Sequence, residues 1–176
     1  KPVFTTMTFD ATGHTLTGTS PRIFAELMSN MGADAVGVNC SLGPKDLKPI
    51  VEELLQYCDK PIIVQPNRGI PTLRCGRAVY SLSTEDYANA MRTFCDQGVA
   101  VLGGCCGTNP EFIAAIAQNK GKQVTSRTIV RKATITSATQ AITFDKVQIC
   151  GERINPTGKK ALTAALQEGS LELAMQ

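Results

Sequence analysis

Four short apolar runs alternate with helical segments over the first 120 residues, and this alternation constrains the fold more than any other feature. Strands are predicted at 3–9, 35–39, 61–65 and 99–103, and helices at 21–31, 44–58, 84–97 and 110–118. Mostly apolar strands that alternate with helices are typical of a parallel sheet covered by those helices. The sequence therefore predicts an α/β fold of four strand–helix units.

The predicted helices begin at recognisable start signals. Ser20 precedes Pro21, and either Ser83 or Thr84 precedes a first turn that carries acidic residues. The pair Asn109-Pro110 opens the fourth helix. Small polar residues cap helix N-termini and proline is favoured at the first helical position, so these helix starts are well specified.

Polar and sulfur-containing residues follow the ends of the predicted strands. They are Asp10, Asn39-Cys40, Pro66-Asn67 and Cys105-Cys106. In a (β/α)8 barrel the chemistry gathers at this rim. A doubly wound sheet is the competing architecture, but no phosphate-type glycine loop follows any of the four strands. Four units make half of a barrel, so we expect residues 1–120 to be the C-terminal half of a (β/α)8 TIM barrel from a longer polypeptide.

Two adjacent cysteines framed by glycines, Gly103-Gly104-Cys105-Cys106-Gly107, follow the fourth strand. Neighbouring side chains of an extended strand face opposite ways, so the two sulfurs converge only if the backbone turns sharply, which glycine permits. Cys40 supplies a third sulfur at the end of another strand. Three thiolates fit a zinc site with one open coordination position. Buried cysteines or a closed structural zinc are the alternatives.

Net charge, hydropathy and cysteine count indicate which kinds of partner and which cellular location to expect. The net charge of +3 over 176 residues is spread without a basic block, so no nucleic acid and no membrane surface is expected as a partner. No run approaches the roughly 18 apolar residues of a membrane span. Seven cysteines, an odd count without the spacing of a small disulfide-rich domain, favour reduced thiols and a cytoplasmic location.

Four motifs in order resemble the second half of the homocysteine S-methyltransferase barrel. They lie at residues 10–16, 37–44, 65–71 and 103–113. The resemblance covers roughly residues 1–120 and implies zinc ligation by Cys40, Cys105 and Cys106, with homocysteine as substrate. The family usually has a small residue where Arg68 stands.

The tail resembles a second module. Residues 147–160, which include the run Gly151-Glu152-Arg153-Ile154-Asn155, resemble the first strand and loop of the pterin-binding barrel of cobalamin-dependent methionine synthases. The expected organisation is a half barrel at 1–120, a linker at 121–145 that could pair as short strands, and the truncated start of a pterin-binding domain at 146–176. That start comprises a strand at 146–150 and a helix at 160–176. The expected partners are the other modules of the same polypeptide, namely the N-terminal half barrel and the pterin and corrinoid domains.

The resemblance implies methyl transfer to the zinc-activated thiolate of homocysteine, which forms methionine. The methyl group would come from methylcobalamin, held by a module outside this chain, and would be replenished from 5-methyltetrahydrofolate. One alternative is a corrinoid-independent homocysteine S-methyltransferase that uses betaine or S-methylmethionine. Another is an inactive fragment that at most binds zinc.

Other polar residues near the strand ends have two interpretations each. Asn39 and Asn67 are candidate substrate-binding residues, although either could instead stabilise its own loop. The resemblance implies that Asn155 lies near the pterin. Asp10 could support the substrate site or form an Asx-turn before Gly13. His14, the single histidine, is expected to be a loop residue and not a fourth ligand.

Overall fold

The structure is a computed structural model that describes residues 1–124, 127–149 and 155–175. Its contacts divide the chain into two compact units, Lys1–Thr143 and Phe144–Gln176. Each unit is described by itself. Among the described residues, no helix has both the length and the apolar character needed to cross a membrane.

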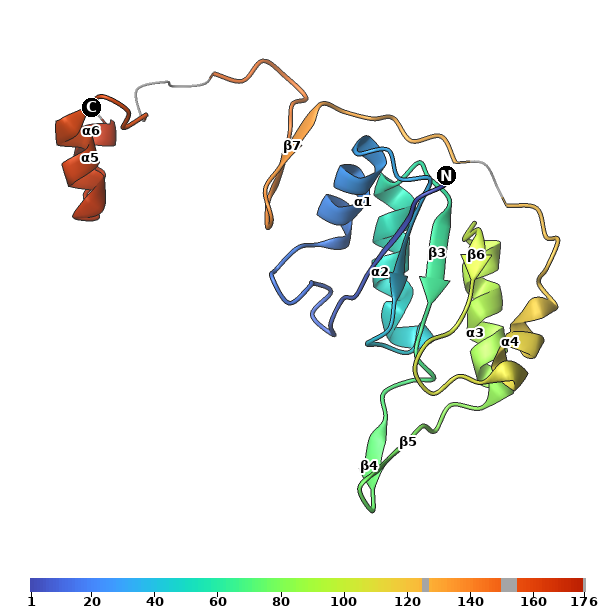
Figure 1. Cartoon of the computed structure of the whole chain (residues 1–176). Helices are drawn as coiled ribbons and strands as arrows, with labels where there is room; N and C mark the ends of the chain where they lie inside the picture. Colours follow the sequence, from blue (N-terminus) through green and yellow to red (C-terminus); the bar gives the residue numbers. More distant parts are fainter. Residues whose placement is uncertain (125–126, 150–154, 176) are drawn as a thin grey trace. The chain divides into compact units, whose positions relative to one another are not determined.

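The first unit is built on a parallel sheet in the order β1-β2-β3-β6 (Figure 1). The strands are β1 Phe4–Met7, β2 Ala35–Asn39, β3 Ile62–Gln65 and β6 Val101–Leu102. Their spatial order follows their order in the sequence, without the reversal that marks a doubly wound sheet. This confirms the predicted α/β fold, and sequential winding is consistent with part of a TIM barrel.

Three helices connect the strands of the sheet and a fourth follows β6, and consecutive helices pack against one another. They are α1 Pro21–Asn30, α2 Pro44–Tyr57, α3 Thr84–Asp96 and α4 Pro110–Ala117. The predicted caps form. The Ser20 Oγ accepts from the Ile23 N–H at 3.3 Å, the Ser83 Oγ from the Asp86 N–H at 3.1 Å, and the Asn109 Oδ1 from the Glu111 N–H at 3.0 Å.

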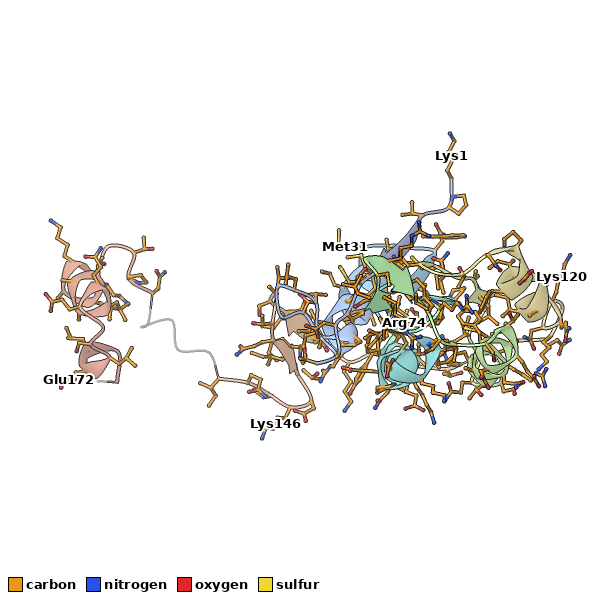
Figure 2. All side chains as sticks on the ribbon, turned by 90° about the horizontal axis from the view of Figure 1, so that it is seen from below. Lys1, Met31, Arg74, Lys120, Lys146 and Glu172 are labelled. Atoms are coloured by element: carbon orange, nitrogen blue, oxygen red, sulfur yellow. The ribbon has the colours of Figure 1, made fainter. Side chains whose placement is uncertain are left out.

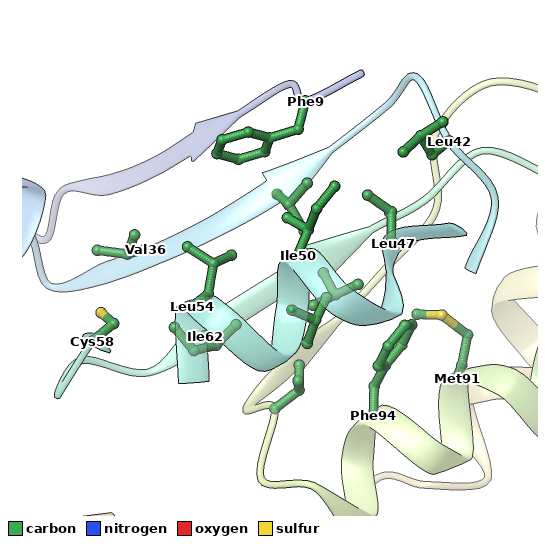
Figure 3. Close-up of a cluster of buried hydrophobic side chains, with 14 of the residues drawn as sticks. Phe9, Val36, Leu42, Leu47, Ile50, Leu54, Cys58, Ile62, Met91 and Phe94 are labelled. Carbon is green, nitrogen blue, oxygen red and sulfur yellow. The ribbon is translucent and has the colours of Figure 1, made fainter. Parts of the chain in front are cut away.

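The core lies between the sheet and the helices (Figure 3). Figure 2 shows the side chains as sticks on the ribbon. In the strand register Val36 pairs with Ile62 and Val38 pairs with Val64, and all four side chains are fully buried. Helix α2 contributes Leu47, Ile50, Val51 and Leu54 to the same cluster. The opposite face of β2 carries only Ala35, Gly37 and Asn39. Burial of the side chains that face the helices therefore fixes the register of β2 against β3.

A hairpin not predicted from the sequence follows β3. Strands β4 Thr72–Arg74 and β5 Arg77–Val79 pair antiparallel, and the hairpin extends beyond the arrowhead ends of the parallel strands (Figure 1). At its two-residue tip, Cys75 and Gly76 both have positive φ, 50° and 72°. Such a tip matches the twist of the strands in a hairpin. Every residue of both strands is exposed, so no alternation of apolar and polar residues signals them in the sequence.

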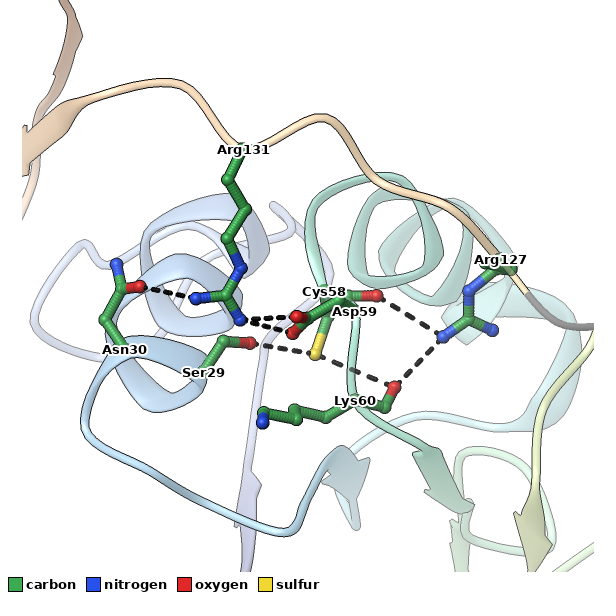
Figure 4. Close-up of polar contacts among 7 residues, drawn as sticks. All are labelled: Ser29, Asn30, Cys58, Asp59, Lys60, Arg127 and Arg131. Atoms are coloured by element: carbon green, nitrogen blue, oxygen red, sulfur yellow. Dashed lines mark hydrogen bonds and ion pairs between the residues drawn. The ribbon is translucent and has the colours of Figure 1, made fainter.

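Two arginines of the predicted linker, Arg127 and Arg131, bind residues of the sheet-and-helix part of the first unit (Figure 4). Arg127 donates hydrogen bonds to the backbone carbonyls of Cys58, Lys60 and Gly98 at 3.4, 3.0 and 2.9 Å. Arg131 contacts both carboxylate oxygens of Asp59 at 2.6 Å. The linker then forms a hairpin, β7 Thr134–Thr136 with β8 Ala141–Thr143, in agreement with the expected short strands. The division by contacts falls at Thr143 and Phe144, although the predicted domain limits themselves stay predictions.

We expect Arg127→Ala to destabilise the chain more than Arg131→Ala does. Loss of Arg127 removes a charged donor from three carbonyls, which costs about 2 kcal/mol. Arg131 and Asp59 form a half-exposed ion pair, which contributes less than about 1 kcal/mol despite its short distance. Urea unfolding measures both, with Arg92→Ala, an exposed arginine of α3, as control. Equal losses for the two variants would contradict this account of the linker.

The second unit contains two short helices, α5 Lys160–Gln167 and α6 Glu172–Met175. The predicted helix at 160–176 is thus divided, and Gly169 with a φ of 75° ends its first part. The predicted strand at 146–150 is wrong over residues 146–149, where Val147 and Ile149 are 93% and 97% exposed. A strand needs a neighbour for its backbone hydrogen bonds, and no described strand pairs with this segment. Cys150 lies outside the described residues, and the pterin-binding module stays a prediction.

Candidate metal centre

The three cysteines singled out in the sequence meet at one point of the first unit. The sulfur atoms of Cys40, Cys105 and Cys106 all lie within 4.8 Å of one another. The Cys40–Cys106 and Cys105–Cys106 Sγ separations are 3.7 and 3.9 Å. Zinc–sulfur bonds of about 2.3 Å in a tetrahedron place neighbouring sulfurs about 3.8 Å apart. The spacing of the thiols therefore fits a zinc ion.

Cys40 reaches this point through a strained turn at the end of β2. Cys40 and Ser41 have φ values of 65° and 61°, and such a left-handed conformation costs a non-glycine residue about 1–2 kcal/mol. The Leu42 N–H donates to the Cys40 carbonyl at 2.8 Å, and the Cys40 N–H donates to the Gln65 carbonyl at 3.0 Å. Strain of this kind concentrates at functional sites, where the surrounding structure holds it in place.

Cys105 and Cys106 lie on a tight turn between β6 and α4. The Thr108 N–H and Oγ1 both donate to the Cys105 carbonyl, at 3.2 and 2.7 Å. Gly107, with a φ of 78°, supplies the left-handed residue of the turn, and a Cβ on Gly104 would lie 2.6 Å from the Thr108 Oγ1. The predicted sharp turn is confirmed: Gly107 provides its conformation and Gly104 its space.

The loop after β3 joins the two cysteine-bearing loops. On one side the Asn67 N–H donates to the Leu42 carbonyl at 3.0 Å. On the other, the Cys105 N–H donates to the Pro66 carbonyl and the Arg68 N–H donates to the Cys106 carbonyl, each at 2.9 Å. Backbone hydrogen bonds thus hold the three loops in register beyond the last strand pairs.

Asn67 connects the same loops with its side chain. It is 6% exposed, and its Oδ1 accepts from the Cys106 N–H at 3.0 Å. The side chain of Asn67 therefore joins the loop after β3 to the loop that carries Cys106, while direct contact with substrate stays a prediction.

The surroundings separate the acidities of the thiols. The pKa of Cys40 is lowered, chiefly by a hydrogen bond from the Ser41 N–H, with smaller effects in the same direction from Cys105, Cys106 and Asn67. Burial, followed by the hydrogen bond with Cys40, raises the pKa of Cys105 to about 11. Cys40 thus ionises more readily than Cys105. Cys106 is exposed and the other two thiols are half-buried, so the site is open to a ligand from solvent.

We expect Asn67→Ala to weaken zinc binding roughly 10- to 100-fold, the usual effect of losing a group that orients a ligand. The Cys106 N–H loses its acceptor, so the turn that carries Cys106 is joined to the β3 loop by fewer hydrogen bonds. Competition with a chromophoric chelator measures the dissociation constant. Asn89→Ala, at an exposed position of α3, is the matched control, and an equal effect of both variants would contradict the assigned role.

Asp10 and His14 are occupied within their own loop. The Asp10 Oδ1 accepts from the Thr12 N–H and Oγ1 at 2.8 and 2.5 Å, and these hydrogen bonds lower the pKa of the carboxyl. The His14 Nδ1 lies 3.0 Å from the Thr12 carbonyl. The Asx-turn is confirmed, and the metal-ligand group found among the described residues contains no histidine.

The remaining sequence candidates lie in different places. Asn39 is half-buried, directly precedes Cys40 and pairs in register with Gln65, so it shares the rim of the sheet with the cysteines. Asn155 belongs to the second unit, where its Oδ1 accepts from the Thr157 N–H at 3.0 Å. A role for Asn39 in substrate binding and a role for Asn155 in pterin binding stay predictions.

Arg68, the departure from the family pattern, has its side chain engaged by neighbouring elements. Its Nε donates to the Leu82 carbonyl at 2.8 Å, and its guanidinium lies 4.8 Å from the ring centre of Phe112. The backbone N–H of Arg68 remains bonded to Cys106. Arg68 therefore supports the loop through Leu82, Phe112 and Cys106. No hydrogen bond joins its guanidinium to the three sulfurs among the described residues.

Tyr87 of α3 is a residue near the site that sequence reasoning missed. It is fully buried, and its hydroxyl lies 3.2 and 3.0 Å from the carbonyl oxygens of Pro66 and Gly103, which share its single proton. Burial raises its pKa, and negative charge on Cys105 raises it further, so the hydroxyl remains a donor. In the sequence Tyr87 is simply one apolar-face residue of a helix, and no motif distinguishes it.

Comparison with known proteins identifies the family to which residues 1–120 are similar. Residues 1–120 match the family model described as Homocysteine S-methyltransferase. The chain is 32% identical over 173 residues to a methionine synthase of Mycobacterium tuberculosis and 31% identical over 175 residues to one of Mycobacterium leprae. Each alignment covers 94% of this chain but 14% of the relative, so the chain spans a small part of these proteins. The chain belongs to the homocysteine S-methyltransferase family.

Proposed function

We propose that this chain carries the zinc centre at which a methionine synthase methylates homocysteine. The observation that carries the proposal is the group of three thiols within 4.8 Å, open to solvent at the exposed Cys106. Three protein ligands and one open position are the arrangement of a catalytic zinc, whereas structural sites are closed by four.

Cys40, Cys105 and Cys106 would hold the ion. A bound zinc supplies Lewis-acid chemistry, which favours the thiolate form of a thiol substrate at neutral pH. The residues of the chain fix the sulfurs: the strained turn positions Cys40, and Asn67 holds the backbone of Cys106. We propose that Asn39, at the same rim, contacts homocysteine.

The methyl donor in this proposal is methylcobalamin, recharged from 5-methyltetrahydrofolate by other modules of the polypeptide. Similarity to the two methionine synthases extends over 94% of the chain, past the family match that ends at residue 120. That extension favours the proposal over an enzyme that uses betaine or S-methylmethionine. In the same proposal residues 146–176 begin a pterin-binding domain in which Asn155 lies near the pterin.

A methyl-donor comparison on the whole polypeptide that contains this chain tests the proposal. Homocysteine is incubated with methylcobalamin, betaine or S-methylmethionine, and methionine is quantified for the parent and for Cys106→Ala. We expect methionine from methylcobalamin with the parent alone. Turnover with betaine or S-methylmethionine, or full turnover by Cys106→Ala, would contradict the proposal.

A further inference from the structure

Tyr87 is placed where the two loops of the metal centre leave the sheet. The ladder between β3 and β6 ends at the pair Val64–Leu102, followed by one further bond from the Gly103 N–H to the Val64 carbonyl at 3.0 Å. Beyond this point the strands supply no further pairs. Besides the loop hydrogen bonds from the Cys105 and Arg68 amides, the hydroxyl of Tyr87 supplies a side-chain connection, because it lies within hydrogen-bond distance of the carbonyls of both Pro66 and Gly103.

These two carbonyls belong to residues that come shortly before the site residues in the sequence. Pro66 precedes Asn67, whose Oδ1 holds the Cys106 N–H, and the Pro66 carbonyl also accepts from the Cys105 N–H at 2.9 Å. Gly103 stands two positions before Cys105. One hydroxyl therefore joins the loop that orients the ligands to the loop that carries them.

Tyr87 is itself firmly held. It is fully buried, and its ring packs edge-to-face on Phe112 of α4, with the ring centres 5.3 Å apart. Helix α4 begins at the cap Asn109, directly after the turn that ends at Thr108. The hydroxyl is thus carried by packed helices and not by the loops that it joins.

We propose that Tyr87 is a positioning residue of the metal centre, whose hydroxyl sets the separation between the Pro66–Arg68 loop and the Gly103–Cys106 loop. This inference rests on the proposed zinc centre. Without the hydroxyl, the two carbonyls lose a common donor, and the Cys105 and Cys106 amides lose the fixed distance to their acceptors.

The test is zinc affinity of the 176-residue chain with and without the hydroxyl. Tyr87→Phe keeps the ring and its packing on Phe112. Tyr57→Phe is the matched control, because no described partner binds the Tyr57 hydroxyl. Ile62→Val is a second control. Ile62 is fully buried at the other end of β3, so this variant lowers the stability of the chain modestly without changing the site. Chelator competition is performed well below each variant's melting temperature.

We expect the zinc dissociation constant to rise roughly 10- to 100-fold in Tyr87→Phe and to stay within about threefold of the parent in both controls. Amide hydrogen exchange of the metal-free chain gives a second readout. Exchange at Cys105 and Cys106 should accelerate in Tyr87→Phe, while exchange in β2 should not.

An unchanged dissociation constant in Tyr87→Phe would overturn the inference, as would an equal loss of affinity in Ile62→Val. Weaker binding without faster exchange at Cys105 and Cys106 would overturn it as well, because the loops would then not have moved. A folded parent chain that binds no zinc would instead contradict the proposed zinc centre, and this inference would fail with it.

Discussion

Replacing Cys106 with serine is expected to abolish zinc binding by this chain at micromolar metal. Cys106 lies 3.7 and 3.9 Å from the other two sulfurs, and among the described residues these three thiols make up the candidate ligand group. A serine hydroxyl is a poor ligand for zinc beside thiolates. Structural zinc sites bind with about 10–16 kcal/mol, so losing one of three ligands should weaken binding by more than roughly 1,000-fold.

Chelator competition on Cys40→Ser, Cys105→Ser and Cys106→Ser measures this effect. Cys75→Ser, at the exposed tip of the β4–β5 hairpin, is the matched control and should bind zinc as the parent does. Retention of parent-like affinity by any of the three ligand variants would exclude the three-thiol site as described.

The second large effect is expected at Gly37, in the middle of β2. A Cβ at this position would lie 2.1 Å from the carbonyl oxygen of Ile63 and 2.6 Å from its Cβ. The clash is with the backbone of the neighbouring strand, so no side-chain rotation relieves it. Gly37→Ala should lower the free energy of unfolding by about 3 kcal/mol, and Gly37→Val should prevent folding.

This expectation opposes strand propensity, since valine is ordinarily favoured in strands and glycine weakens them. Thr6→Val tests the same row of the sheet, because Thr6 pairs with Gly37 but is exposed on the edge strand β1. Urea unfolding should show a change of less than about 1 kcal/mol for Thr6→Val. A folded Gly37→Val chain as stable as the parent would contradict the close approach of β2 and β3.

Local sequence patterns were sufficient to predict the parallel strands and the helices of the first unit. Helix α2 was expected at 44–58 and forms at Pro44–Tyr57, and β2 forms over the five residues expected. Start signals such as Ser20 and Ser83 act within three residues along the chain, so sequence alone reveals them. The cysteine group could be anticipated because parallel strands bring their carboxyl ends to one edge.

The support of the site could not be predicted in the same way. The hydroxyl of Tyr87 meets carbonyls 21 and 16 residues away, and the side chain of Asn67 meets an amide 39 residues away. Such pairs depend on how α3 and the loops pack in three dimensions. Arg127 is a comparable case, because its partners Cys58, Lys60 and Gly98 come together only when the sheet has formed. The strand expected at 146–150 is absent over its described residues 146–149, because apolar sequence does not form a strand without a partner.

X-ray absorption at the zinc edge tests the central claim most directly, on the purified and reduced chain before and after addition of homocysteine. We predict one zinc per chain with three sulfur ligands and one lighter atom, and a fourth sulfur once homocysteine is added. That result would establish a three-thiol site with one position open to a thiol. A folded chain without zinc, or a zinc whose ligands are unchanged by homocysteine, would contradict it.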